Sequence, residues 1–254
     1  SVTDPVIEAK RLYVDQLNMS ETLSGHNEGS FIVWDVGLGA GTNAMATVRE
    51  YERLHEEKGG LPGLRIISFE NDLDSLRLAV KNPALFPHVK HPAPAAILGH
   101  GEWSSSRFPV EWILLEGDFR DHIASADVPD CIYYDPFSLH TDTPLWRYQM
   151  FKELYEKCIK GKTMLFTYSS STQVRGALLA AGFYVGKGAG TGPKSETTAA
   201  FSVKEACPPW IELLDRDWLG RFERSSSKYG SYCSDDEKSE IERRVLEHPQ
   251  FSVL

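Results

Sequence analysis

Three alternating glycines that directly follow an apolar segment could hold a nucleotide-like cofactor. The segment is 31–36, and the glycines are Gly37, Gly39 and Gly41. Because glycine has no Cβ, such a turn can adopt positive φ and let a ligand lie against its backbone amides. A helix predicted to begin at Asn43 would add an electropositive N-terminus at the same place, with Asn43 among the cofactor-binding residues. The pattern therefore predicts a cofactor site.

The acid at Asp35, two residues before the first glycine, indicates which cofactor this is. Dinucleotide-binding turns read G-x-G-x-x-G, whereas this turn reads G-x-G-x-G. A carboxylate here can receive the α-ammonium group of S-adenosylmethionine, but it would repel a pyrophosphate. We therefore expect S-adenosylmethionine rather than a dinucleotide.

Two later predicted strands also end in acids. Glu70 would hold the ribose diol with Asn71 beside it, and Asp118 would accept from the adenine amino group. Open parallel sheets bind ligands at the carboxyl ends of their strands, so we expect these acids to converge with Asp35 on one crevice. A glycine turn that binds nothing is the alternative interpretation of the first segment.

A fourth predicted strand runs into the turn Tyr134-Asp135-Pro136-Phe137, which resembles the Asp/Asn-Pro-Pro-aromatic motif of amine methyltransferases with one proline fewer. A carboxylate and carbonyl oxygens can orient an amine lone pair, and an aromatic ring can hold a flat substrate. We therefore predict catalytic roles for Tyr134, Asp135 and Phe137, with Asp135 also near the cofactor, and substrate contacts for Pro136 and Trp146. An Asp-Pro pair that only begins a turn remains the alternative.

A second glycine-rich segment, 186–196, is predicted to be a substrate-facing lid that carries Lys194 and Glu196. Arg175 could form a basic patch with Lys187 and Lys194 at the mouth of a cleft, which would suit an RNA phosphate. A plain connection between two strands is the alternative for the glycine-rich segment.

Charge and composition limit the partners. The chain has 254 residues, with 27 basic against 36 acidic residues, and its formal charge of −9 counts against extensive RNA contact. We expect no metal site, because the histidines lack ligand spacing and the four cysteines lack C-x-x-C spacing. No apolar run approaches the roughly 18 residues that span a bilayer, so we expect no membrane segment and a cytoplasmic location. The oligomeric state stays open.

Alternating strand and helix patterns predict an α/β fold, with a mostly parallel sheet, helices on both faces and one antiparallel strand near 197–203. Residues 1–30 are expected to form a lead-in helix, and residues 31–205 the catalytic domain. Five prolines predict an irregular insertion at 82–109. Residues 206–254 are expected to form a C-terminal helical extension.

The order of these motifs is similar to that of MnmC-like methyltransferases, namely the methyltransferase domain of the bifunctional tRNA 5-methylaminomethyl-2-thiouridine protein and its stand-alone relatives. The resemblance implies a class I, Rossmann-like fold with S-adenosylmethionine at Gly37, Gly39, Glu70 and Asp118, and an amine-positioning role for Asp135. It further implies methylation of an aminomethyl group on the wobble uridine of tRNA. The motifs that carry it are Val33-Trp-Asp-Val-Gly-Leu-Gly-Ala-Gly-Thr-Asn-Ala, Ser68-Phe-Glu, Leu115-Glu-Gly-Asp, Tyr134-Asp-Pro-Phe-Ser, Pro144-Leu-Trp, Phe166-Thr-Tyr, Val174-Arg, Ala181-Gly-Phe and Gly192-Pro-Lys-Ser-Glu.

The chain departs from this family at the predicted substrate side. Where relatives usually read Asp-Gly-Phe-Ala/Ser-Pro, this chain reads Asp135-Pro-Phe-Ser-Leu, and Pro193 and Ser195 stand at positions that are often basic. A methyl- or aminopropyltransferase for a small, polyamine-like amine is therefore one alternative, and a non-catalytic S-adenosylmethionine-binding module is another. The family's usual N-terminal β-hairpin has no counterpart, as expected of a fragment or a trimmed chain.

Overall fold

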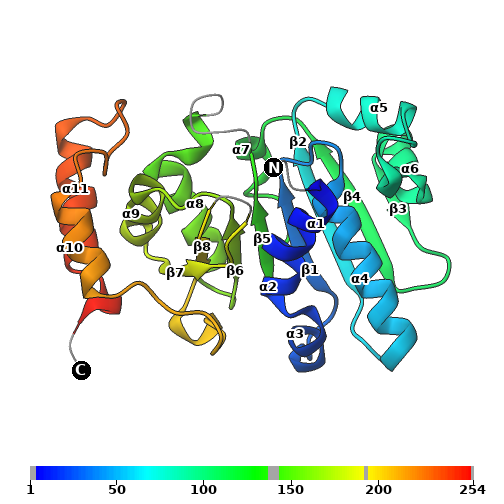
Figure 1. Cartoon of the computed structure of the whole chain (residues 1–254), viewed down its shortest axis with the longest axis horizontal. Coiled ribbons are helices and arrows are strands. Elements are labelled where there is room, and N and C mark those ends of the chain that lie inside the picture. The colour runs from blue at the N-terminus through cyan, green and yellow to red at the C-terminus, as the bar shows by residue number, and fades with distance from the viewer. Residues whose placement is uncertain (1–3, 137–142, 192–193, 253–254) are drawn as a thin grey trace. The chain divides into compact units, whose positions relative to one another are not determined.

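The structure is a computed structural model that describes residues 4–136, 143–191 and 194–252. The chain divides into two compact units (Figure 1). Residues 1–136 together with 191–193 form the first unit, and the rest of the chain forms the second. Each unit is described by itself.

Five strands make up the sheet of the first unit, in the order β3-β4-β2-β1-β5. β1, β2, β4 and β5 pair in parallel, and β3 pairs antiparallel to β4. β1 and β2 are nearly continuous apolar runs because parallel strands are covered on both faces. The strands span Phe31–Val36 (β1), Leu64–Glu70 (β2), Glu102–Ser104 (β3), Val110–Glu116 (β4) and Cys131–Tyr134 (β5).

A helix follows each of three parallel strands, as the alternating pattern predicted. These are α4 (Thr42–Lys58) after β1, α5 (Asp74–Lys81) after β2 and α7 (Phe119–His122) after β4. α4 runs along one face of the sheet and presents a row of buried apolar side chains to it (Figure 1). The glycine turn therefore lies between a central strand and a long helix.

The predicted lead-in helix is present but interrupted. It consists of α1 (Pro5–Ala9), a π-helical turn (Lys10–Val14), α2 (Asp15–Leu17) and α3 (Met19–Gly25). The break falls at Asn18, which has φ +44° and a side chain that donates to Glu21 at 2.7 Å. Asparagine tolerates this left-handed conformation better than most residues, and the helical pattern alone did not predict it.

The insertion at 82–109 contains more regular structure than predicted. It holds a 3-10 turn (Pro87–Lys90), α6 (Pro92–His100) and strand β3. Pro92 occupies the first turn of α6, where a missing N–H costs no hydrogen bond, and the His91 ring nitrogen accepts from the amide of Ala93 at 3.2 Å. The prolines therefore begin elements here as well as ending them.

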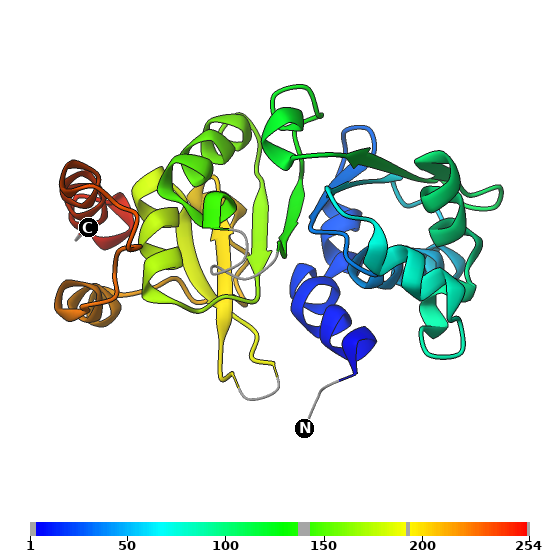
Figure 2. The ribbon, with the colours of Figure 1, turned by 90° about the horizontal axis from the view of Figure 1, so that it is seen from above.

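The second unit contains a three-stranded antiparallel arrangement, in which β8 (Thr197–Phe201) lies between β6 (Met164–Thr167) and β7 (Tyr184–Gly188) (Figure 2). The predicted reversed strand is thus confirmed. Helix α8 (Tyr148–Cys158), which follows a 3-10 turn at Thr143–Trp146, precedes β6, and α9 (Thr172–Ala181) follows it.

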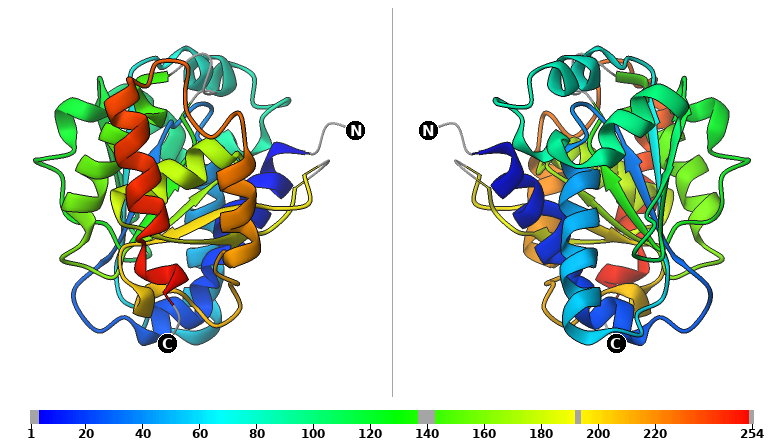
Figure 3. Two further views of the ribbon diagram at one scale, coloured as in Figure 1. Left: turned by 90° about the vertical axis from the view of Figure 1, so that its left-hand side faces the viewer. Right: turned by 90° about the vertical axis from the view of Figure 1, so that its right-hand side faces the viewer.

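The C-terminal segment forms α10 (Arg216–Arg224) and α11 (Asp235–Leu246), which run side by side (Figure 3). Both pack on α9, where Gly176 leaves room for the ring of Phe222. The C-terminal segment also reaches the strand β7, where the Gln250 side-chain oxygen accepts from the Val185 amide at 2.7 Å. Two further 3-10 turns span Lys204–Ala206 and Pro249–Phe251.

Candidate functional site

The glycine turn has the backbone conformation that its sequence predicted. Gly37, Gly39 and Gly41 have φ values of +91°, +53° and +78°, a region that other residues rarely adopt. A Cβ on Gly37 would lie 2.4 Å from the carbonyl oxygen of Asp135, so the turn and the end of β5 are in close contact. At Gly39, by contrast, no atom of the described residues lies within 4 Å of the Cβ position. Gly39 therefore faces open space in which a ligand can contact the backbone.

Glu70 fixes this turn from the neighbouring strand. Its Oε2 accepts from the amide of Gly39 at 3.0 Å, and its Oε1 accepts from the amides of Asn71 and Asp72 at 2.9 and 3.1 Å. The side chain is almost fully buried. Each carboxylate oxygen can accept further hydrogen bonds, so Glu70 can hold both the turn and the hydroxyls of a bound ribose.

Asp35 is fully buried within β1, opposite Ser68 in the register of β1 and β2. The Ser68 hydroxyl donates to Asp35 Oδ2 at 2.8 Å, and the Trp112 indole donates to the Ser68 hydroxyl at 2.9 Å. Among the residues that the structure describes, Asp35 Oδ1 has no hydrogen-bond partner. The sequence analysis missed Ser68 and Trp112, because only strand register brings them to Asp35.

The electrostatics of Asp35 follow from its position. Burial raises its pKa to about 7, the hydrogen bond from Ser68 opposes this, and the charges of Asp135 and Glu70 add to it. A cation beside this group would favour its ionised form. The buried, under-bonded carboxyl therefore suits the neighbourhood of an ammonium group.

Asp118 and Asn71 lie at the same edge of the sheet, because the Gly117 amide donates to the Glu70 carbonyl at 2.8 Å. The Asp118 carboxylate caps α7 by accepting from the amide of Arg120 at 2.9 Å and also pairs with the Arg120 guanidinium, which lowers its pKa. Asn71 is exposed. The predicted adenine contact at Asp118 stays a prediction, and it requires the carboxylate to accept from the adenine as well as from Arg120.

Asp135 follows β5, and its Oδ2 accepts from the side-chain amide of Asn43 at 3.0 Å. Asn43 belongs to the first turn of α4, so the candidate catalytic acid is tied to the helix that leaves the glycine turn. Pro136 is buried beside Gly37, and Tyr134 is fully buried with its ring near that of Phe119. Phe137, the third predicted catalytic residue, lies outside the described residues.

Arg175 does not belong to an exposed basic patch, and that prediction is corrected. Only 2% of the residue is exposed, and its guanidinium donates to the Thr198 hydroxyl at 3.0 Å, the Thr197 carbonyl at 2.7 Å and Glu196 at 2.8 Å. The residue lies on α9, which is buried from Val174 to its end. Arg175 and Glu196 therefore join α9 to β8 within the second unit.

The other two predicted substrate contacts of this unit differ from each other. Trp146 is fully buried and packs near the rings of Phe151 and Tyr168, so it is a core residue rather than a surface contact. Lys194 is exposed, and its ammonium donates to the Tyr168 carbonyl at 3.0 Å and lies 4.8 Å from the centre of that ring. Only Lys194 of these residues has the exposure that a lid contact needs.

His88 is a further residue that the sequence analysis missed. It is buried in the 3-10 turn of the insertion, and its Nε2 lies 2.9 Å from the carbonyl oxygen of Ala40 in the glycine turn. Burial lowers its pKa, so the neutral ring donates through Nε2–H. A lone histidine in a proline-rich segment carries no sequence signal for this contact.

Two features are absent from the described residues. None of their helices combines the length and apolarity needed to cross a membrane. No group of three or more histidine, cysteine or acidic residues among them is arranged to hold a metal ion.

Comparison with known proteins shows which protein family this chain is similar to. Residues 92–203 match the family described as S-adenosyl-L-methionine-dependent methyltransferase. The tRNA 5-methylaminomethyl-2-thiouridine biosynthesis bifunctional protein MnmC of Aeromonas salmonicida is 27% identical over 74% of this chain and 30% of its own length. The protein of the same name from Aeromonas hydrophila is 26% identical over 80% of this chain and 33% of its own length. This chain thus spans about a third of the length of these curated relatives.

Among solved structures, MnmC2 from Aquifex aeolicus superposes with a TM-score of 0.66 and 22% identity, covering 94% of this chain and 73% of that one. This similarity confirms the class I, Rossmann-like α/β fold. The matched segment is therefore similar to S-adenosylmethionine-dependent methyltransferases. More particularly, the predicted resemblance to MnmC-like methyltransferases is confirmed by the named relatives.

The residues present fit this cofactor. Gly39 leaves open space against the backbone, and the fully buried Asp35 has a carboxylate oxygen, Oδ1, with no hydrogen-bond partner among the described residues. We assign the amino-acid end of the cofactor to the side of Asp35 and the glycine turn, and the ribose to Glu70. Each of these residue assignments is a proposal.

Proposed function

We propose that this chain transfers a methyl group to the amine nitrogen of an aminomethyl group on a modified wobble uridine of tRNA. The observation that carries this proposal is the position of Asp135, whose carboxylate is held by Asn43 at 3.0 Å and whose carbonyl oxygen lies against Gly37 of the cofactor turn. The names of the curated relatives supply the substrate class. The proposal assigns the chain to the cytoplasm, where tRNA is found.

The proposed methyl transfer requires mainly that the amine nitrogen and the methyl group be held in the right positions. S-adenosylmethionine supplies a methyl group on a sulfonium sulfur. The amine nitrogen uses its lone pair to form the new N–C bond as the S–C bond breaks, and the nitrogen then loses one proton to Asp135 or to water. Asp135 would orient an N–H of the amine so that the lone pair points toward the methyl carbon. Asn43 would hold Asp135 in that position.

A small, polyamine-like amine is a second candidate substrate, because the formal charge of −9 favours a cationic substrate over a polyanion. Asp135 would orient such an amine in the same way. The two candidates differ in the acceptor and not in the cofactor, so one assay with two acceptors separates them.

The test is a methyl-transfer assay with labelled S-adenosylmethionine at saturation, using tRNA that carries the unmethylated aminomethyl group or free polyamines as acceptor. We expect label in tRNA with the wild type. We expect at least a 100-fold lower rate with Asp135→Asn, because general acid–base and positioning groups typically contribute about 10²- to 10⁴-fold. A Lys160→Met variant is the control, because it removes an exposed charge at a residue with no proposed contact to substrate or cofactor, and it should keep the rate within a few-fold.

Three outcomes would count against the proposal. Label in polyamines but not in tRNA would favour the second candidate. Cofactor binding without transfer to either acceptor would favour a non-catalytic module. An unchanged rate in Asp135→Asn would remove the role given to this carboxylate.

A further inference from the structure

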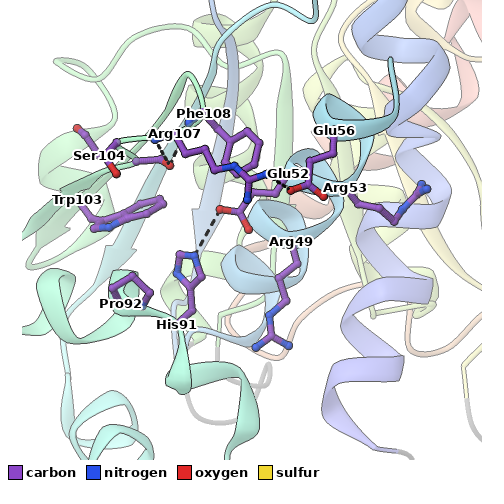
Figure 4. A pocket seen from close by; sticks show the side chains of 12 residues that line it. Arg49, Glu52, Arg53, Glu56, His91, Pro92, Trp103, Ser104, Arg107 and Phe108 are labelled. Carbon is purple, nitrogen blue, oxygen red and sulfur yellow. Dashed lines mark hydrogen bonds and ion pairs between the residues drawn. The ribbon is translucent and has the colours of Figure 1, made fainter. Parts of the chain in front are cut away.

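A pocket of about 460 Å³ opens on the first unit, away from the glycine turn (Figure 4). α4 forms one wall with Arg49, Glu52, Arg53 and Glu56, and the other wall consists of the start of α6 and the β3–β4 connection. No part of the proposed methyl transfer uses this pocket. Its lining is polar and charged, with the aromatic side chains of His91, Trp103 and Phe108 among it.

The arginines that line the pocket differ in whether a carboxylate already neutralises their charge. Arg53 pairs with Glu50 and Glu57 at 2.6 and 2.5 Å, and Arg107 pairs with Glu56 at 2.8 Å. Arg49, one helical turn before Arg53, has no carboxylate partner among the described residues, and its guanidinium donates only to the Pro87 carbonyl at 3.3 Å. Arg49 therefore keeps an uncompensated positive charge at the pocket.

An aromatic surface lies on the opposite wall. The Trp103 ring is half-buried, and the His91 ring meets it edge-on with 5.1 Å between ring centres (Figure 4). His91 Nε2 lies 3.4 Å from Glu52 Oε1, so this acid already has a neighbour within the pocket. Trp103 and Arg49 thus line the same pocket, with His91 between them (Figure 4). This combination suits a base and its phosphate.

The chain beside the pocket is free of acidic residues. Acids make up 36 of 254 residues, or about one in seven, yet residues 75–101 contain none, whereas they include Arg77, Lys81 and Lys90. Lys81 and Lys90 are exposed. The segment comprises most of α5, the 3-10 turn and α6, which pack on one another, and the 3-10 turn also packs on α4. In a chain with a charge of −9, this is a locally basic surface that a polyanion can approach.

We propose that this pocket binds an unpaired nucleotide of the RNA substrate, with the base stacked on Trp103 and a phosphate at Arg49, and that Lys81 and Lys90 contact the neighbouring backbone. The inference rests on the proposed function. Arg49 lies seven residues into α4 from Thr42, which at 1.5 Å per residue is about 10 Å from the glycine turn. One RNA molecule can therefore contact the pocket while another of its nucleotides is at the reaction site.

The test compares Arg49→Ala with Arg243→Ala, a control on α11 that removes the same charge outside the pocket and whose guanidinium pairs with Glu240 and Glu247. The affinity of dye-labelled tRNA is measured by anisotropy over a range of salt concentrations. We expect Arg49→Ala to weaken binding by about 5- to 10-fold and to reduce the salt slope by about one, and Arg243→Ala to match the wild type. The KM for tRNA should rise in Arg49→Ala with kcat unchanged.

Trp103 is tested with two variants, because its partial burial also supports β3. Trp103→Phe keeps a stacking ring and should bind tRNA within a few-fold of the wild type, whereas Trp103→Leu keeps apolar volume only and should weaken binding by about 10-fold. Melting temperatures check that both variants fold.

The inference is overturned if the wild type binds and methylates tRNA while Arg49→Ala and Trp103→Leu bind it as tightly as the wild type; the proposed function then stands. If the wild type neither binds nor methylates tRNA, the proposed function and this inference both fail. Equal losses in Arg49→Ala and Arg243→Ala would indicate a diffuse charge effect and would also contradict a pocket centred on Arg49.

Discussion

The cofactor turn of the first unit and the α9–β8 region of the second differ in what holds their key residues. In the first, backbone amides and strand ends define the site, and Gly39 and Glu70 meet through a hydrogen bond of 3.0 Å. In the second, Arg175 was predicted to face a substrate, but it is buried and holds β8 through three partners. The comparison teaches that a backbone conformation, such as the positive φ of three glycines, can be predicted from a local sequence pattern. A site assigned from side-chain charge alone cannot.

The largest expected effect comes from Arg175. Replacing it with Met leaves the buried Thr198 hydroxyl and Thr197 carbonyl without their donor and leaves Glu196 without its counter-ion. We expect the free energy of unfolding to fall by about 3 to 5 kcal/mol in Arg175→Met, as measured by urea denaturation. Lys194→Met, which removes an exposed charge, should change it by less than about 1 kcal/mol. A stable Arg175→Met protein with weakened tRNA binding would restore the basic-patch prediction.

The next effect concerns Asp35 and its dependence on pH. Its pKa rises from 3.8 to about 7 on folding, so between these values the folded protein holds a proton that the unfolded chain has released. The contribution of Asp35 to the free energy of unfolding is therefore fully present below about pH 4 and is lost as the pH rises through about 7.

The measurement is the free energy of unfolding of the wild type and Asp35→Asn at several pH values. The stability of Asp35→Asn relative to the wild type should grow as the pH rises from about 4 to about 7, by up to about 4 kcal/mol for a three-unit shift. A difference that stays constant across this range would show that the buried carboxyl does not titrate there.

A smaller effect is expected at Gly37. Its φ of +91° is strained for alanine, and the new Cβ would lie 2.4 Å from the Asp135 carbonyl oxygen, so the turn and β5 must separate. We expect Gly37→Ala to lower the free energy of unfolding by about 2 kcal/mol or more in chemical denaturation. Full stability in this variant would mean that the turn and Asp135 are not in the close contact described.

Much of the first unit could be predicted because its signals are local. The strands, α4, the positive φ at three glycines and the acids at strand ends each follow from a few consecutive residues. The π-helical turn, the break at Asn18 and the elements of the insertion could not be predicted in this way, because prolines and polar residues there act as caps whose effect depends on packing.

The parts of the site that escaped prediction all depend on contacts between distant residues. Ser68 reaches Asp35 only through the register of two strands, and His88 reaches the glycine turn from a segment 48 residues farther along the chain than Ala40. Arg175 is buried because β8 supplies partners more than 20 residues away. Nothing in the residue types themselves distinguishes these positions from exposed ones.

The most direct test of the account is calorimetric titration of the wild type, Gly39→Ala and Glu70→Ala with S-adenosylmethionine. A Cβ at Gly39 has no protein neighbour within 4 Å, so despite the strain of alanine at φ +53° this variant should fold, with folding checked by its melting temperature, and yet lose affinity because the methyl group fills the cofactor's space. We predict saturable binding by the wild type and at least about a 10-fold loss in both variants, the size of a charge-assisted hydrogen bond or more. Wild-type affinity in both folded variants, or no binding by the wild type, would contradict a cofactor site at the glycine turn and Glu70.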